Sequence, residues 1–371
     1  MQNSNKLYIN GEWVEPKGAE TLSVINPANE KVICDITLAS KADLDIAVLS
    51  AKDAFASFSN ITIEEKIELF SSIIESFKKR LNDLSETISL EMGAPITLSK
   101  KAQAPSGLGH FINTLNALKN FKFEEIFESY LVRKEPIGVC GLITPWNWPI
   151  NQITCKVAPA LAAGCTLILK PSEVAPLSSI IFSEILHDAG LPKGVFNLVQ
   201  GDSKIGMDMS QHLSIDMISF TGSTRAGISV AKNSANTVKR VTQELGGKSA
   251  NIILRDADFA KSIKKGVLSC MSNSGQSCNA PTRMLIPIDK MEEAINIGKE
   301  SIKGIVVGDP KNPETTLGPV VNKIQYEKIN SYIEKGITEG ATLVTGGIGF
   351  PDNIEEGFFV KPTIFANVTN N

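Results

Sequence analysis

Hydrophobic residues recur with a helical period in the first third of the chain. Apolar side chains follow one another at alternating steps of four and three, at Ile63, Ile67, Phe70, Ile74, Phe77, Leu81, Leu84 and Ile88. Because this spacing places them on one face, it predicts one long amphipathic helix packed on a sheet, although a coiled coil has the same spacing. After the letters EMGAP (91–95), a second helical stretch is expected to reach about Lys119.

Short alternating segments predict strands on either side of these helices. Residues 6–38 contain short apolar runs separated by turn signals at Asn10-Gly11 and Asn26-Pro27. Residues 128–136 alternate like an exposed strand, which would be an edge in need of a partner.

From Gly138 onward, apolar strands alternate with helical stretches. The strands are VCGLIT (139–144), TLILK (166–170), VFNLV (195–199) and MISF (217–220), and the helices lie near 151–163, 176–189, 203–211 and 225–235. This order predicts an α/β fold with a largely parallel sheet and helices on both faces. In such sheets ligands bind beyond the carboxyl ends of the strands.

The residues after three of these strands have ligand-binding chemistry. They are 145–149, 171–173 and 221–227. Gly222 and Ser223 precede a helix, whose free amides suit a phosphate, but Ser223 or Thr224 could equally be an ordinary helix cap. The chain has neither a Gly-x-Gly-x-x-Gly fingerprint nor a Walker-type sequence.

Three charged residues near strand ends have two interpretations each. Glu173 can accept hydrogen bonds from two ribose hydroxyls with the ammonium of Lys170 nearby, or the two can form a solvated surface ion pair. Glu244, in VTQELGGKS (241–249), is expected to follow a strand and precedes two glycines. It can act as a general base if burial raises its pKa, or it can cap a turn.

Composition narrows the range of partners. The chain has 371 residues, 42% of them hydrophobic, and 37 Lys+Arg against 40 Asp+Glu give a net charge of −3. This length suggests two or more domains, and this charge leaves nucleic acid an unlikely partner. No secretory signal is visible, and the longest apolar stretch, 157–169, is too short to span a bilayer, so a cytoplasmic protein without a membrane partner is expected.

The cysteines and histidines show no metal-binding spacing. Six cysteines are scattered without a Cys-x-x-Cys pair, at Cys34, Cys140, Cys155, Cys165, Cys270 and Cys278. This scattered spacing favours reduced thiols over a disulfide framework. Because the chain also has only three histidines, no metal site is expected. Cys278, within SNSGQSCNAPTR (272–283), is either a nucleophile or a small packing residue, and its local sequence does not decide which.

Six motifs together resemble the aldehyde dehydrogenase superfamily, in its hydrolytic NAD(P)-dependent branch. They are ITPWNWP (143–149), KPSE (170–173), FTGSTRAG (220–227), ELGGKS (244–249), GQSCNAPTR (275–283), and GDP followed by LGP (308–319). The resemblance implies a Rossmann-type cofactor domain over 1–245 and an α/β catalytic domain over 246–371. It also implies oligomerisation strands at 121–137 and a homodimer or homotetramer.

The resemblance assigns catalytic roles to three residues. Cys278 is the nucleophile that attacks a small aldehyde and then carries a thioester. The side-chain amide of Asn147 and the backbone N–H of Cys278 stabilise the oxyanion, and Glu244 activates the water that hydrolyses the thioester.

The same resemblance implies a set of cofactor contacts. They are Ile143, Thr144, Pro145, Trp146, Lys170, Ser172, Glu173, Gly201, Gly206, Phe220, Thr221, Gly222, Ser223, Leu245 and Gly246. Because Glu173 repels a 2′-phosphate, NAD is favoured over NADP, although Lys170 offsets part of that repulsion.

In this family the catalytic domain extends past the position equivalent to residue 371, and that further part contains a Glu-Ile-Phe-Gly-Pro motif and a C-terminal strand. A C-terminally truncated member is therefore expected. Three alternatives stay open: a CoA-acylating semialdehyde dehydrogenase, which Glu244 disfavours, a redox-free thiol acyltransferase or hydrolase, and an inactive nucleotide-binding fragment.

Overall fold

The structure, a computed structural model, describes residues 2–369 and divides into two compact units. The first unit takes residues 1–24, 32–88 and 100–245, and the second takes 25–31, 89–99 and 246–371. Residues 370 and 371 of the expected catalytic domain lie outside the described residues.

Two early segments do not follow the expected division at residue 245. Residues 25–31 and 89–99 belong to the second unit because backbone hydrogen bonds attach them to it. Phe358 N–H donates to the carbonyl of Pro27 at 2.9 Å, and Ile96 N–H donates to that of Pro310 at 2.8 Å. Such partners are far away in sequence, so no local pattern could have assigned these segments.

The first unit is built on a seven-stranded sheet. Its order is β11-β10-β7-β8-β9-β1-β2, with bounds Arg240–Leu245, Met217–Gly222, Val139–Ile143, Thr166–Lys170, Phe196–Leu198, Leu7–Ile9 and Glu12–Val14. Strands β7 to β11 are parallel, whereas β1 pairs antiparallel with both β9 and β2. Every residue of β7 and β8 is buried, as their continuous apolar runs require in a sheet covered on both faces.

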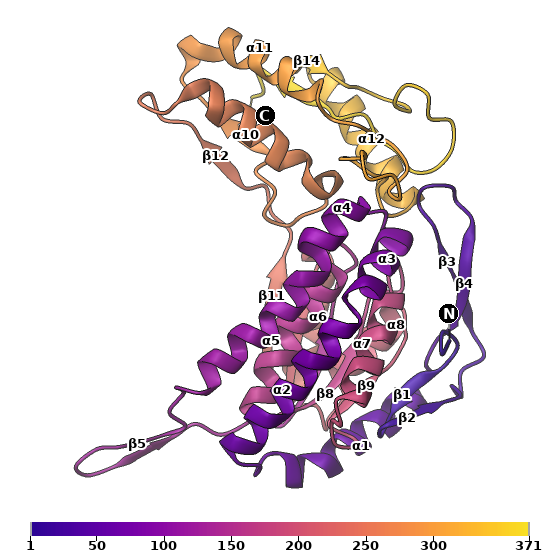
Figure 1. The fold of residues 1–371 in the computed structure, drawn as a ribbon, viewed down its shortest axis with the longest axis vertical. Helices are drawn as coiled ribbons and strands as arrows, with labels where there is room; N and C mark the ends of the chain where they lie inside the picture. The colour runs from indigo at the N-terminus through magenta and orange to yellow at the C-terminus, as the bar shows by residue number, and fades with distance from the viewer. Residues whose placement is uncertain (1, 370–371) are drawn as a thin grey trace. The chain divides into compact units, whose positions relative to one another are not determined.

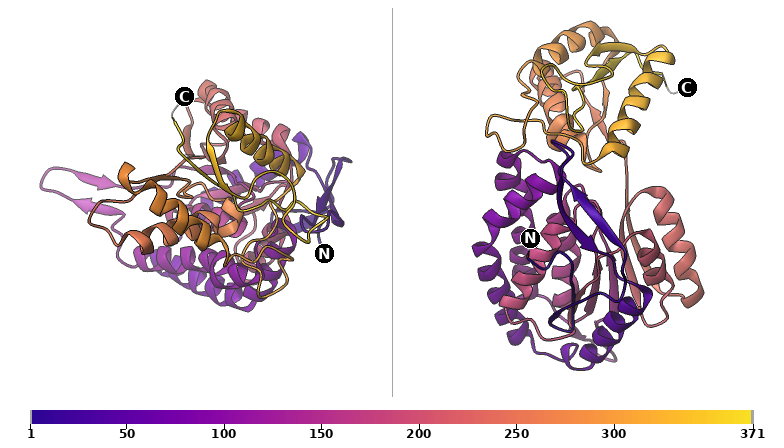
Figure 2. Two further views of the ribbon diagram at one scale, coloured as in Figure 1. Left: turned by 90° about the horizontal axis from the view of Figure 1, so that it is seen from above. Right: turned by 90° about the vertical axis from the view of Figure 1, so that its right-hand side faces the viewer.

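Helices cover both faces of this sheet (Figures 1 and 2). One layer contains α2 (Ile63–Lys79), α5 (Ala104–Leu118), α6 (Pro149–Ala163) and α7 (Leu177–Asp188), which pack on one another. The other contains α1 (Lys41–Phe58), α8 (Ser203–Gln211) and α9 (Thr224–Ser234), whose apolar residues share one core with β7, β8 and β10. The predicted α/β fold and the elements between 139 and 235 are confirmed.

The predicted single helix over residues 63–88 is wrong, because it is two helices. α2 ends at Lys79 and α3 runs from Leu81 to Met92, with Arg80 between them at φ −105° and ψ 7°. The Arg80 guanidinium binds Asp83 at 2.6 Å and Glu184 at 3.0 Å. The apolar spacing passes through the break unchanged, so periodicity alone could not reveal it.

Two short hairpins have most of their residues in the first unit, although the turn of the first hairpin (25–31) belongs to the second unit. β3 (Thr21–Ile25) pairs with β4 (Val32–Thr37), and β5 (Glu124–Ile126) pairs antiparallel with β6 (Leu131–Arg133). Figure 1 shows the β5–β6 hairpin extending away from the helices of its unit. β6 is the exposed strand predicted within 128–136.

The second unit combines two small sheets with helices. β12 (Ala250–Ile252) pairs parallel with β13 (Arg283–Leu285), and β14 (Thr342–Thr345) pairs antiparallel with β15 (Ile364–Ala366). Its helices are α4 (Ile96–Leu98), α10 (Phe259–Met271), α11 (Met291–Ile302) and α12 (Lys323–Thr338). α10 and α11 pack on each other around a core that includes Phe259, Ile263 and Val267.

Candidate active site

The carboxyl ends of four parallel strands lie in register at one edge of the first unit. Ile143 at the end of β7 pairs with Lys170 at the end of β8 and with Phe220 of β10, and Gly222 pairs with Leu245 of β11. The chain runs from β7 to β8 and β9 on one side, and then returns to place β10 on the other side of β7. The strand order therefore reverses between β7 and β10, which is where open parallel sheets bind ligands.

Two buried hydroxyls mark this point of reversal. Thr144 follows β7 and is 3% exposed, and Thr221 lies in β10 and is 7% exposed. Within the described residues, neither Oγ1 atom has a hydrogen-bond partner. Because buried polar atoms are nearly always paired, both fit a polar ligand at this edge.

Lys170 organises the neighbouring turn. The residue is 4% exposed, and its ammonium donates to three oxygens: the carbonyls of Pro171 at 2.9 Å and Gly201 at 2.6 Å, and Glu173 Oε2 at 3.2 Å. Burial lowers the pKa of Lys170, and the nearby Glu173 opposes that shift. The alternative of a solvated surface pair is wrong for Lys170, whereas the Glu173 side chain keeps 34% exposure and can receive a ligand.

Three further predicted contacts lie around this turn. Ser172 Oγ accepts from the N–H of Val174 at 3.3 Å, which closes the turn after β8. Gly201 must be glycine, since a Cβ there would lie 2.7 Å from Ile205. Gly206, in α8, faces Lys170 and Ile143, where a Cβ would lie 3.8 Å from each. The turn is thus fixed by its own contacts.

Ser223 is the N-cap of α9, as one of the two interpretations predicted. Its hydroxyl accepts from the N–H of Ala226 at 3.3 Å. Gly222 precedes it at the end of β10, and a Cβ there would lie 2.6 Å from the ring of Phe220. A capping serine leaves other amides of the first helical turn unpaired within the helix, so this role does not exclude an anion site.

Asn147 lies in the loop that joins β7 to α6, together with Pro145 and Trp146. Both ends of the loop are fixed: Thr144 N–H donates to the carbonyl of Lys170 at 3.1 Å, and Gln152 N–H donates to that of Trp148 at 2.9 Å. Asn147 is therefore held directly before the first turn of α6.

Glu244 is the penultimate residue of β11, rather than a residue after the strand as expected. It interacts electrostatically with Cys155 and Lys156 of α6. Burial raises the pKa of Cys155 and lowers that of Lys156, and Glu244 raises both. Asn147 and Glu244 thus approach the same helix, one before its first turn and the other near its second.

Cys278 is exposed, on a turn of the second unit that follows α10. The backbone reaches it through a left-handed segment, with φ of 54° at Asn273, 56° at Ser274 and 73° at Gly275. Left-handed backbone costs energy for residues other than glycine, so tertiary contacts must hold this segment.

Those contacts come from the LGP motif and from Val321 just after it, and EMGAP packs against the motif in turn. The Ser274 hydroxyl donates to the carbonyl of Gly318 at 2.8 Å, and Gln276 Oε1 accepts from Val321 N–H at 2.9 Å. Gly318 in turn abuts Gly93, whose carbonyl oxygen would lie 2.1 Å from a Cβ on Gly318. The sequence alone suggested no role for EMGAP, although the glycine in it was a usable signal of close backbone approach.

The chain passes from the first unit to the second between Leu245 and Gly246. Just after that point, a Cβ on Gly247 would lie 3.2 Å from the carbonyl oxygen of Cys278. Arg283 Nε also donates to the carbonyl of Lys248 at 2.8 Å. Residues 246–249, which directly follow Glu244 and Leu245 in sequence, therefore pack against residues 272–283, which we call the cysteine loop.

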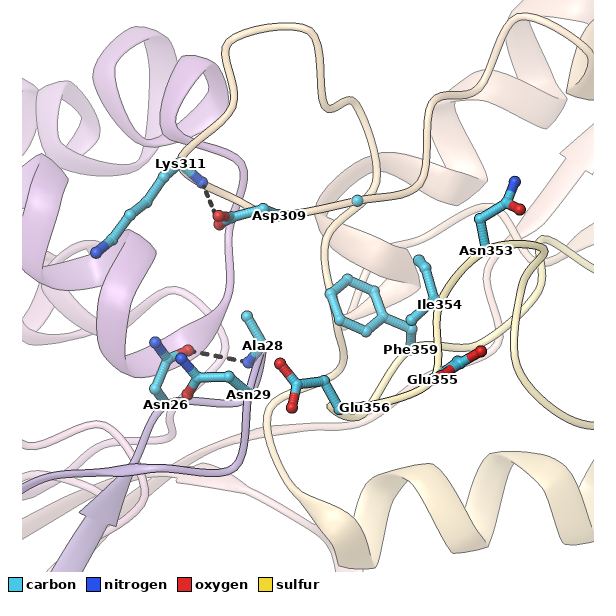
Figure 3. Close-up of a pocket in the computed structure, with 11 residues that line it drawn as sticks. Asn26, Ala28, Asn29, Asp309, Lys311, Asn353, Ile354, Glu355, Glu356 and Phe359 are labelled. Carbon is cyan, nitrogen blue, oxygen red and sulfur yellow. Dashed lines mark hydrogen bonds between the residues drawn. The ribbon is translucent and has the colours of Figure 1, made fainter.

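The second unit also has a cavity of about 300 Å³. It lies between residues 26–29, 308–311 and 353–359, with Phe359 and Asp309 among its walls (Figure 3). None of the predicted site residues lines it. Residues 2–369 hold no group of three or more metal-ligating side chains, and no helix among them is long and apolar enough to cross a membrane.

Comparisons with known proteins agree with these motifs. The family model described as "Aldehyde dehydrogenase family" matches residues 13–371. A 3-succinoylsemialdehyde-pyridine dehydrogenase from Pseudomonas sp. is 49% identical over 370 residues, which are 99% of this chain and 78% of that protein.

Solved structures give the same result. A cysteine-to-alanine variant of aldehyde dehydrogenase C from Pseudomonas syringae, in complex with NAD+ and octanal, superposes with a TM-score of 0.98 at 46% identity over 99% of this chain and 76% of that one. An NAD+ complex of aldehyde dehydrogenase from Bacillus cereus has a TM-score of 0.94 at 35% identity over 99% of this chain and 75% of that one. The chain belongs to the aldehyde dehydrogenase family.

Proposed function

We propose that this protein oxidises an aldehyde to a carboxylic acid with NAD, and that Cys278 is the nucleophile. The observation that carries the assignment is the exposure of Cys278 on a turn fixed by two distant segments, in a chain of this family. Cys140 and Cys165, by contrast, are 3% exposed and lie at the sheet of the first unit. An exposed thiol can reach a substrate, whereas a buried one is a packing residue.

In the first step the Cys278 thiolate forms a bond with the aldehyde carbon, and the carbonyl electron pair moves to oxygen. The Asn147 side-chain amide and the Cys278 backbone N–H donate hydrogen bonds to this oxyanion. NAD, when bound, supplies the hydride acceptor. Loss of the hydride from the former aldehyde carbon leaves a thioester on Cys278.

Glu244 acts in the second step. Its carboxylate takes a proton from a water molecule, which attacks the thioester carbon. The carbon–sulfur bond breaks, the Cys278 thiolate is restored, and a carboxylic acid leaves. A CoA-acylating reaction would not need this base, so the presence of Glu244 beside α6 favours hydrolysis.

The strand-end edge of the first unit is the proposed NAD site. Support comes from the buried unpaired hydroxyls of Thr144 and Thr221, the exposed part of the Glu173 carboxylate, and the NAD+ found in two similar structures. Glu173 would accept from the adenine-ribose hydroxyls, and its charge would repel a 2′-phosphate, so NAD is preferred to NADP. Since Lys170 already has three acceptors, its role is to orient Glu173.

The substrate is a small aldehyde. One relative is named for a semialdehyde of a succinoylpyridine, and another structure holds octanal. These two compounds differ in polarity, so a panel that ranges from aliphatic aldehydes to aromatic semialdehydes, read by NADH absorbance, would define the preference of this chain.

The β5–β6 hairpin is the proposed contact between subunits of a homodimer or homotetramer. It exposes Ile126 at 86%, Tyr130 at 58% and Leu131 at 52%. Apolar side chains on a short two-stranded ribbon favour association with another strand or subunit. Light scattering with Ile126→Lys would test this, since the variant should have a lower mass than the parent protein.

A reducing compartment such as the cytoplasm is the proposed location. None of the six cysteines, all of which lie within residues 2–369, forms a disulfide, and the proposed chemistry requires Cys278 as a thiol.

The decisive experiment replaces Cys278 by Ala. Aldehyde-dependent NAD reduction should fall by at least about 10³-fold, because no other group carries the acyl intermediate. Cys270→Ala is the matched control, since Cys270 lies in α10 only eight residues earlier and burial raises the pKa of its thiol. Activity that survives Cys278→Ala would refute the proposal.

A further inference from the structure

We propose that Gln103 is a positioning residue for the aldehyde oxidation. Its side-chain amide holds the backbone of Asn147 and thereby fixes the direction of the oxyanion-binding amide. This inference rests on the role proposed for Asn147, and it adds a residue that no motif in the chain suggested.

The loop that carries Asn147 has few backbone donors of its own. Pro145 and Pro149 lie on either side of it and have no N–H groups. The loop is fixed at Thr144 and Trp148, but these bonds act at its ends. Between them, Gln103 Nε2 donates to the carbonyl oxygen of Asn147 at 3.3 Å. The Gln103 side chain, which comes from another element, thus supplies a hydrogen bond at Asn147 itself.

Gln103 is itself firmly held. It is 0% exposed and ends a π-helix, Ser99–Gln103, directly before α5. Its carbonyl accepts from the Ser106 hydroxyl at 2.7 Å. π-helical turns are rare and occur frequently at functional sites, because they redirect a side chain within a helix. Here the side chain at the end of the π turn meets the Asn147 loop.

Close packing between α5 and α6 supports the hydrogen bond from Gln103 to Asn147. A Cβ on Gly107 of α5 would lie 2.9 Å from Cγ1 of Ile150, which is in the first turn of α6. Only glycine permits this approach, so the two helices are in direct contact one turn beyond Gln103. The Gln103 amide and the Asn147 loop therefore belong to one rigid part of the first unit.

Oxyanion stabilisation depends strongly on such positioning. Removal of one donor costs about 10²–10³-fold in kcat, and a displacement of about 1 Å can cost about 10²-fold. The Asn147 loop keeps its end contacts when Gln103 is replaced. We therefore expect Gln103→Met to lower kcat by less than removal of the donor itself, about tenfold. This substitution preserves side-chain length and removes the donor.

The test uses tryptophan fluorescence as well as activity. The chain has three tryptophans, and Trp146 and Trp148 flank Asn147. In a Trp13→Phe background their quenching by acrylamide reports the order of the loop without any substrate. Gln103→Met should increase quenching and lower kcat about tenfold. Gln103→Asn keeps an amide on a shorter side chain, so it should have a smaller effect in the same direction.

Asn197→Leu is the matched control. Asn197 is also a 0% exposed amide in the first unit, and its Nδ2 donates to the carbonyls of Leu167 and Gly194. Its replacement should lower thermal stability without changing quenching of the loop tryptophans. If Gln103→Met does not fold, Gln103→Asn carries the same comparison.

A double-mutant cycle separates this inference from the proposed function. If Gln103 acts through Asn147, Gln103→Met should cost nothing further in an Asn147→Ala background. The inference would be overturned if both Gln103 variants had unchanged quenching and unchanged kcat. It would also be overturned if Gln103→Met lowered kcat by the same factor in the Asn147→Ala background. A fully active Asn147→Ala variant would instead refute the role of Asn147 itself.

Discussion

The strand-end edge of the first unit and the cysteine loop of the second unit are built in opposite ways. Ile143, Lys170 and Leu245 are placed by a ladder of parallel strands in register. Cys278 instead follows a left-handed segment that is held by bonds to residues beyond position 317. The regular sheet fixes the strand-end edge through many backbone bonds, whereas the position of the exposed Cys278 depends on a few specific contacts.

The first prediction separates the two chemical steps assigned to these regions. Glu244→Gln removes the base for hydrolysis but leaves the thiol and the oxyanion donors, so the steady-state kcat should fall about 10²–10⁴-fold. Rapid mixing should still show a burst of NADH, because the acylation step does not need Glu244. Glu86→Gln, the same change at an exposed position of α3, should leave both phases intact. Loss of the burst together with kcat would contradict the division of roles.

The second prediction concerns the support of the cysteine loop. In Gly318→Ala the added methyl would meet the backbone carbonyl of Gly93 at 2.1 Å, so the backbone must shift, at a cost of about 1–3 kcal/mol in the free energy of unfolding. Alkylation of Cys278 by iodoacetamide should change in rate, since the shifted Gly318 carbonyl accepts from Ser274.

Gly304→Ala is the control for this change. A Cβ at Gly304 would meet no atom within 4 Å, so urea unfolding and alkylation should both stay close to those of the parent protein. Equal behaviour of the two variants would show that the LGP segment does not support the cysteine loop.

The third prediction tests the strand-end edge and has the smallest effect. Ser223→Ala removes the side-chain cap of α9 and should lower stability by about 1 kcal/mol. It should also weaken NAD binding, measured by calorimetry, if the start of α9 contacts the cofactor. Asp258→Ala removes the cap of α10 in the second unit and should lower stability without that loss of NAD affinity. Equal NAD affinities in the two variants would argue against a cofactor contact at Ser223.

The difference between the two regions also explains what the sequence could predict. The strands of the strand-end edge follow from local apolar runs, and their parallel order follows from alternation with helices. The break at Arg80 was missed because the apolar period continues across it, and Arg80 is held by Glu184, which is distant in sequence.

The cysteine loop could be recognised by its motif, but its hydrophobic pattern does not predict its conformation. Its support comes from Gly93 and Gly318, which are 225 positions apart in the numbering and whose relation appears only when the chain folds. The burial of Lys170 was likewise not readable from KPSE, since its acceptor at Gly201 lies on the next turn. Contacts between distant segments, rather than local propensity, account for each of these differences.

In the proposed reaction Cys278 carries the acyl group of the substrate, and peptide mass spectrometry tests this assignment directly. Glu244→Gln is mixed with NAD and an aldehyde, quenched in acid, digested and analysed by peptide mass spectrometry. The peptide that contains Cys278 should carry an added mass equal to that of the aldehyde less two hydrogen atoms. An acyl group on another cysteine, such as Cys155 near Glu244, or no acyl group after NADH has formed, would contradict it.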